Sequence, residues 1–99
     1  MSDSKVIYKY ELPIDYEWHK LPMGKVVHIG RALGDMVHVW IQQYPLEQDW
    51  FKYRVVRTGQ AVSKWHFYIG TTINEPYVWH VYQQGLPAYN AATGERASA

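Results

Sequence analysis

Apolar and polar residues alternate with a period of two along most of this chain, which is typical of β-strands with one buried face. The clearest case is the segment KVIYKYEL, residues 5–12, in which apolar side chains from Val6 to Leu12 fall two positions apart. Pro13 is expected to end this strand because proline cannot donate a hydrogen bond to a neighbouring strand. The segment therefore predicts a half-buried strand.

The same pattern recurs in short segments along the chain and predicts six or seven strands. The segment 16–21 is the weakest of them, and no stretch of ten or more residues has a helical period. Short strands joined by tight loops predict an all-β fold, a small antiparallel sandwich or barrel. The expected strands are residues 5–12, 16–21, 25–32, 36–43, 50–57, 65–71 and 77–82.

The chain length and the ends of the pattern predict one domain. Ninety-nine residues suffice for a single domain with a modest core. We expect a flexible lead at residues 1–4, a β domain at residues 5–83 and a flexible tail at residues 84–99. The tail is rich in alanine, glycine and small polar residues and has no period.

The two strands around Leu33-Gly34-Asp35 predict a hairpin with a three-residue loop, in which Gly34 supplies a positive φ. This register pairs His28 with Trp40 and Gly30 with His38. It gathers one uniformly apolar face, which a two-residue loop would mix with polar residues. The apolar face is expected to comprise Val27, Ile29, Val37, Val39 and Ile41. His28, His38 and Trp40 are then expected on the opposite face.

Composition and charge exclude several classes of protein. The formal net charge is only +1, so we expect neither a nucleic acid nor a membrane surface as partner. Cysteine is absent, which excludes disulfides and thiolate chemistry, and no apolar run approaches the roughly 20 residues of a membrane helix. With five Trp and nine Tyr, some rings are expected at a binding surface rather than in the core.

Catalytic and metal-binding motifs are weak. Five histidines are present, but none has a metal-ligand spacing, and the serines lie in termini or in a loop. Loop acids such as Asp35 and Glu75 could form an acid–base pair, although loop carboxylates ordinarily face water. We therefore expect a non-enzymatic protein with no cofactor and no metal.

The strand at residues 50–57 and the polar turn that follows it are the strongest candidate for a binding element. Lys52 and Arg54 interleave with aromatic residues, a pattern that suits single-stranded nucleic acid, a nucleotide-like molecule or an aggregation-resistant edge strand. For Lys52 and Arg54 we favour the interpretation without a ligand, in which they form the solvated face of an amphipathic strand or protect an edge strand from aggregation. Arg57 stands at the start of the turn, where a guanidinium can hold a phosphate or carboxylate in bidentate fashion. The candidate ligand-binding residues are Arg57, Thr58 and Gln60, supported by Arg31, His38 and Trp40.

The order of several short motifs resembles a family of short phage and prophage proteins that share a domain of unknown function. The resemblance covers residues 5–83. The turn of this family tends to read Gly-Thr-Gly, whereas Arg57 replaces the first glycine here. The motifs are IYKYEL, LPMGKVVHI, VHVWI, FKYRVVRTGQAV, YIGT and VWHVY.

The resemblance implies a phage protein acting in the cytoplasm of an infected bacterial host. We expect it to counter a bacterial defence system, either by sequestering a nucleotide-type immune signal or by occluding a host defence protein. A homo-oligomer is expected because one small domain has little room for a pocket. The alternatives are a minor virion or assembly protein and a small hydrolase.

Overall fold

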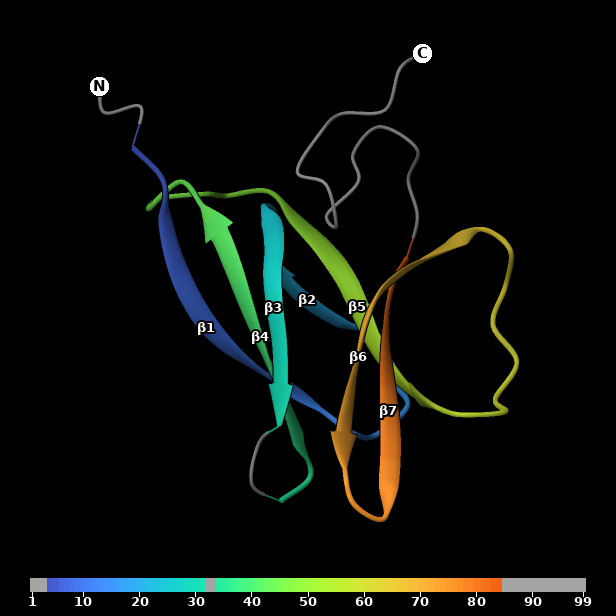
Figure 1. The fold of residues 1–99 in the computed structure, drawn as a ribbon. Coiled ribbons are helices and arrows are strands. Elements are labelled where there is room, and N and C mark those ends of the chain that lie inside the picture. Colours follow the sequence, from blue (N-terminus) through green and yellow to red (C-terminus); the bar gives the residue numbers. More distant parts are fainter. Residues whose placement is uncertain (1–3, 32–33, 85–99) are drawn as a thin grey trace.

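The computed structural model describes residues 4–31 and 34–84, which form seven strands in two antiparallel sheets (Figure 1). None of these residues is helical, so the predicted all-β architecture is confirmed. The expected lead and tail lie outside the described residues, apart from Ser4 and Gln84. No helix that could cross a membrane occurs in the described part of the chain.

Sheet A has three strands and sheet B has four (Figure 1). In sheet A the spatial order is β1 (Val6–Pro13), β4 (Met36–Gln43) and β3 (Lys25–Arg31). In sheet B the order is β2 (His19–Pro22), β5 (Trp50–Arg57), β7 (Tyr77–Gln84) and β6 (His66–Asn74). β4 is the central strand of sheet A, and β5 and β7 are the inner strands of sheet B.

The core lies between the two sheets because the alternating apolar residues of both turn inward. On β4 every second residue from Val37 to Gln43 is buried, and on β5 the same is true from Phe51 to Val55. Burial of such side chains stabilises the fold by about 1.5–3 kcal/mol each. The buried hydrophobic cluster comprises Leu12, Leu21, Val37, Val39, Ile41, Phe51, Tyr53, Val55, Trp79 and Val81.

A polar pair closes one part of this core. The Tyr10 hydroxyl donates a 2.5 Å hydrogen bond to Oε1 of Gln43, whose Nε2 donates to the Tyr44 carbonyl oxygen at 3.3 Å. Burial raises the pKa of the Tyr10 hydroxyl, although the bond to Gln43 opposes the shift. Gln43 therefore has both ends of its amide satisfied although only 4% of its surface is exposed.

The hairpin register is confirmed near the loop and wrong beyond it. Gly30 pairs with His38 and His28 pairs with Trp40, as predicted, and Gly34 has a φ of 73°. A β-bulge between Val26 and His28 then shifts the register, so that Val26 and not Val27 pairs with Ile41. Val27 is 40% exposed and Val26 packs against the core, because a bulge places two residues opposite one.

β1, β2, β6 and β7 also differ from their predicted bounds, and for β2 and β6 the cause is local. β2 begins at His19 rather than at Tyr16, because Tyr16 has a left-handed φ of 63° that no strand accommodates. β6 begins at His66 because a turn holds the preceding residue: Trp65 N donates to Ser63 Oγ and His66 N donates to the Ser63 carbonyl oxygen. Trp65 consequently lies outside β6 and is 71% exposed.

β6 also carries a bulge, between Tyr68 and Gly70, which lies opposite β3 of the other sheet. The two strands pack closely there, since a Cβ on Gly70 would lie 2.8 Å from Cδ1 of Ile29 and would require that side chain to shift. The edge strands β3 and β6 thus approach each other closely across the sandwich, and they run side by side in Figure 1. Past the bulge the register turns Thr72 inward, where it is buried.

Candidate functional site

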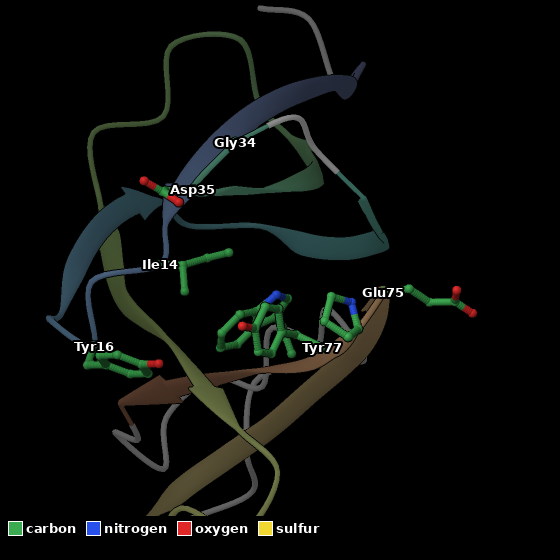
Figure 2. Close-up of a pocket in the computed structure, with 8 residues that line it drawn as sticks. Ile14, Tyr16, Gly34, Asp35, Glu75 and Tyr77 are labelled. Carbon is green, nitrogen blue, oxygen red and sulfur yellow. The ribbon is translucent and has the colours of Figure 1, made fainter.

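Three loops meet at one end of the sandwich and enclose a cleft of about 360 Å³, here called the end cleft. The β1–β2 loop, the β3–β4 loop and the β6–β7 turn each contribute to it, so both sheets form its walls (Figure 2). Its volume falls at the small end of the range for ligand sites. The lining residues are Ile14, Tyr16, Gly34, Asp35, Glu75, Pro76, Tyr77 and Trp79.

A row of three aromatic rings forms one wall of the end cleft. The centroid of the Trp79 ring lies 5.5 Å from that of Tyr77 and 6.5 Å from that of Tyr16. Trp79 is 9% exposed and fixed in β7, whereas Tyr16 and Tyr77 are 39% and 59% exposed. Figure 2 shows Tyr16 and Tyr77 on the side of the cleft opposite Ile14. A planar ligand ring can therefore stack against a rigid centre and two accessible neighbours.

The loop that presents Tyr16 is pinned by Asp15. Oδ1 of Asp15 accepts a 2.9 Å hydrogen bond from Glu17 N, and His19 Nε2 lies 2.8 and 2.9 Å from the two carboxyl oxygens. The bond to His19, followed by that from Glu17, holds the pKa of the Asp15 carboxyl below its usual value of 3.8. These contacts close a tight turn around Tyr16, whose left-handed backbone is unusual for a bulky residue.

Two carboxylates lie on the rim of the end cleft, on different hairpins. Asp35 belongs to the β3–β4 loop, and its carbonyl oxygen accepts a 2.7 Å hydrogen bond from Ile14 N, which ties that loop to the β1–β2 loop. Glu75 lies at the far end from Tyr16, and its carboxyl group points away from the rings (Figure 2). Asp35 can accept hydrogen bonds from ligand N–H or O–H groups at the rim of the cleft, whereas the Glu75 carboxyl group faces solvent.

The predicted turn lies beside this cleft and shares one wall with it. Gln60 N donates to the Arg57 carbonyl oxygen at 3.1 Å, Arg57 N donates to Gln60 Oε1 at 3.3 Å, and Gly59 has a φ of 90°. Arg57, Gln60 and Tyr16 line a shallow hollow of about 340 Å³. Tyr16 thus lines both the end cleft and the hollow that Arg57 and Gln60 border.

Thr58, the third residue predicted in this turn, faces a different surface. Its hydroxyl lies 2.8 Å from Nε2 of His80, a residue on the face of sheet B that points away from the core. Nδ1 of His80 lies 2.9 Å from the Thr71 hydroxyl, which is in turn hydrogen-bonded to the hydroxyl of Tyr68. The structure therefore separates Thr58 from Arg57 and Gln60, although the three are close in sequence.

The supporting residues predicted behind the turn lie on sheet A instead. His38 and Trp40 are on its outer face with His28, as the predicted register required. The Trp40 ring centroid is 5.0 Å from that of His28 and 5.6 Å from that of His38, so these rings pack on one another. Arg31 pairs with Val37 through its backbone, but its side chain lies outside the described part of the structure.

In residues 4–31 and 34–84 no cluster of three or more histidines or acids could hold a metal ion. On sheet A, His38 Nε2 lies 4.0 Å from Glu11 Oε1. This contact brings together two possible metal ligands, fewer than the three that a metal site needs. The functional groups that the end cleft offers are therefore aromatic rings, carboxylates and one neighbouring guanidinium.

Comparison with known proteins assigns the family. The model of a domain of unknown function, DUF7352, matches residues 3–91. The chain belongs to the DUF7352 family. No curated protein and no solved structure gives a significant match. The match spans every strand of the two sheets, so the end cleft and the Arg57–Gln60 turn lie inside the DUF7352 domain.

The sequence interpretation missed the aromatic row of this DUF7352 chain. Tyr16 and Trp79 were assigned to two different strands, residues 16–21 and 77–82, and the patterns of these strands do not indicate that the two rings meet. A partial signal did exist: alternating strand direction places the loops after β1 and β3 at one end, but it would place the turn after β6 at the other end, and only the long connection between β5 and β6 brings that turn to the same end. Tyr16, Asp35 and Glu75 fall in those loops.

Proposed function

We propose that this protein binds a small nucleotide-type ligand at the end cleft and does not transform it chemically. The observation that carries the proposal is that Tyr16 joins two surfaces of complementary chemistry. On one side lies the aromatic row with Tyr77 and Trp79, and on the other lies Arg57. A nucleotide has the same division, since its planar base stacks on rings and its phosphate pairs with a guanidinium.

Each part of the ligand has a matching group. The base would lie over Tyr16 and Trp79, with Asp35 accepting a hydrogen bond from a base N–H or a sugar hydroxyl. The phosphate would lie outside the cleft, next to Arg57, where it avoids the two carboxylates of the rim. Binding would cost little reorganisation, because Trp79 is packed in β7 and Asp15 already pins the Tyr16 loop.

The proposed biological setting rests on the resemblance to phage and prophage proteins. We propose that the ligand is an immune signal that a bacterial defence system produces, and that the protein sequesters it in the host cytoplasm. A host defence protein bound at the same end of the sandwich is the alternative. A homo-oligomer would complete the open side of the cleft. Native mass spectrometry measures the oligomeric state directly.

A panel of linear and cyclic nucleotides tests the proposal by thermal shift and calorimetry. A ligand at 100 times its dissociation constant should stabilise the fold by about 2.7 kcal/mol. Arg57→Gln should weaken a phosphate-bearing ligand about tenfold, as expected for one charge-assisted hydrogen bond, and leave the corresponding nucleoside unaffected. Lys25→Gln, at an exposed position far along β3 from the cleft, is the matched control.

Tyr16→Ala should weaken nucleotide and nucleoside alike, because the ring contacts the base and not the phosphate. If no nucleotide in the panel shifts the unfolding temperature of the wild-type protein, the sequestration proposal is wrong. The host-protein alternative would then be pursued by co-purification from infected cells.

A further inference from the structure

The register of sheet B places a second group of rings and cations on the face that points away from the core, here called the outer face of sheet B. Along β5 the outward positions are those of Trp50, Lys52 and Arg54, because Phe51, Tyr53 and Val55 are buried in the core. Val56 also points outward, but other residues cover it and leave it 2% exposed. The outward residues of the neighbouring strands follow from the Cα pairs. They include Lys20 on β2, Tyr82 and His80 on β7, and His66, Tyr68 and Thr71 on β6.

Positive charge is concentrated on this face. Lys20, Lys52 and Arg54 lie on adjacent strands, and none of the described strand positions that face outward from sheet B is acidic. The net charge of the whole chain is only +1, so the charge is segregated and not merely abundant. Such segregation creates a local positive potential that the total charge does not reveal.

One pair on this face is unfavourable for folding. Lys20 and Lys52 are direct Cα partners in antiparallel strands. Like charges at directly opposite positions destabilise a sheet, whereas opposite charges or a polar pair there would stabilise it. An anionic partner that lies across both side chains would offset this repulsion.

Aromatic rings are interleaved with these cations. Lys20 Nζ lies 4.1 Å from the centroid of the Trp50 ring, and the guanidinium carbon of Arg54 lies 5.8 Å from that of Trp18. Trp50 is 48% exposed and Tyr68 is 53% exposed, so both can stack on a flat ligand. Base stacking on such rings combined with cations that contact phosphate is how proteins bind single-stranded nucleic acid.

The ring of Tyr68 is held in place before any ligand arrives. Its hydroxyl bonds to Thr71, which bonds through His80 to Thr58, and its ring makes an edge contact with Tyr82 at 5.7 Å between centroids. A ring fixed in this way loses little conformational freedom on binding. Two strand spacings across and four residues along the sheet separate Tyr68 from Trp50, a distance of about 16 Å at ~4.8 Å per strand and ~3.3 Å per residue.

That separation exceeds the length of one nucleotide and suits a strand of a few nucleotides. We propose that the outer face of sheet B binds single-stranded nucleic acid, with bases stacked on Trp50 and Tyr68 and phosphates paired with Lys20, Lys52 and Arg54. This surface is distinct from the end cleft, and the proposal does not rest on the nucleotide-binding function. It departs from the expectation drawn from net charge, because net charge contains no information about distribution.

Fluorescence anisotropy with labelled oligo(dT), oligo(U) and a DNA duplex tests the proposal. We expect both single strands to bind at low salt, more tightly than the duplex. Replacing both lysines (Lys20→Gln, Lys52→Gln) should reduce the slope of log affinity against log salt by about 1.4, for two lost phosphate contacts. Lys9→Gln, an exposed lysine on the opposite side of the sandwich, should leave the slope unchanged.

Tyr68→Ala should weaken binding roughly tenfold at every salt concentration, which a loss of charge does not do. Tyr68→Phe retains the stacking ring and should bind like the wild type, which separates stacking from any structural effect of the hydroxyl. A saturating mononucleotide should not displace the oligonucleotide, since the end cleft lies elsewhere. Absence of single-strand binding at low salt, or binding that survives both Tyr68→Ala and the double lysine change, would overturn the proposal.

Discussion

Tyr16 is the residue on which the account of the end cleft depends. It keeps a bulky side chain on a left-handed backbone, a conformation that costs about 1–3 kcal/mol and occurs mostly where surrounding contacts enforce it. Here the enforcing contacts come from its neighbour Asp15, through Glu17 N and His19. The ring is thereby placed between Arg57 on one side and Trp79 on the other.

The lowered pKa of Asp15 makes this loop sensitive to acid. A carboxyl whose pKa is depressed in the folded state stabilises the fold above its unfolded value of 3.8, and this contribution is lost as the pH falls through the folded pKa. We expect the carboxyl of Asp15 to titrate below 3.8 by carbon-detected NMR. Because the bond to His19 is the largest cause, His19→Gln should move the titration back toward that value.

The same variant provides a functional readout. Loosening the Asp15 turn should weaken ligand binding at the end cleft while leaving the two sheets folded, because the loop lies outside the core. A normal pKa for Asp15 in the wild-type protein would show that the contact to His19 does not form in solution.

At the scale of elements, the bulges decide which residues reach the core. The strict alternation of residues 25–32 placed Val27 inside, whereas the bulge in β3 puts Val26 there. Val26→Ala should therefore destabilise the fold by about 1–2 kcal/mol through lost burial. Val27→Ala, at a 40% exposed position on the same strand, should change the free energy of unfolding by less than about 0.5 kcal/mol. Urea denaturation of both variants measures the difference, and equal losses would contradict the bulged register.

The sequence predicts strands well where alternation is uninterrupted. β4 and β5 have the bounds that their patterns indicated, and the hairpin loop at Gly34 has the predicted positive φ. Patterning fails at Val27 because a bulge leaves the composition of a strand unchanged and alters only its pairing. It also fails at Trp65, which a local Ser63 turn removes from β6.

At the scale of the whole molecule, the two-sheet sandwich divides the predicted site residues among three surfaces. Arg57 and Gln60 lie beside the end cleft, Thr58 joins the outer face of sheet B, and His38 and Trp40 pack on sheet A. No sequence pattern indicates this division, because it depends on which faces of each sheet are covered. Of the residues predicted in the turn, only Arg57 and Gln60 lie on the same surface, as their nearness in sequence suggests.

The same division gives the molecule two surfaces of opposite charge. Asp35 and Glu75 lie on the rim of the end cleft, and Lys20, Lys52 and Arg54 lie on the outer face of sheet B. A chain with a net charge of +1 can in this way present both an acidic, aromatic cleft and a basic, aromatic face. The two proposals consequently predict different ligands and different salt dependence.

The most direct test of the central claim is an amide and indole NMR titration of the full chain with the nucleotide that gives the largest thermal shift. We predict that the signals of Tyr16, Asp35, Arg57, Gln60 and the Trp79 indole move together with a single dissociation constant. Signals of the outer face of sheet B, such as those of Lys52 and Tyr68, should stay unchanged in the same titration. Saturable shifts confined to that outer face, with none at Tyr16 or Trp79, would contradict the assignment of the end cleft as the ligand site.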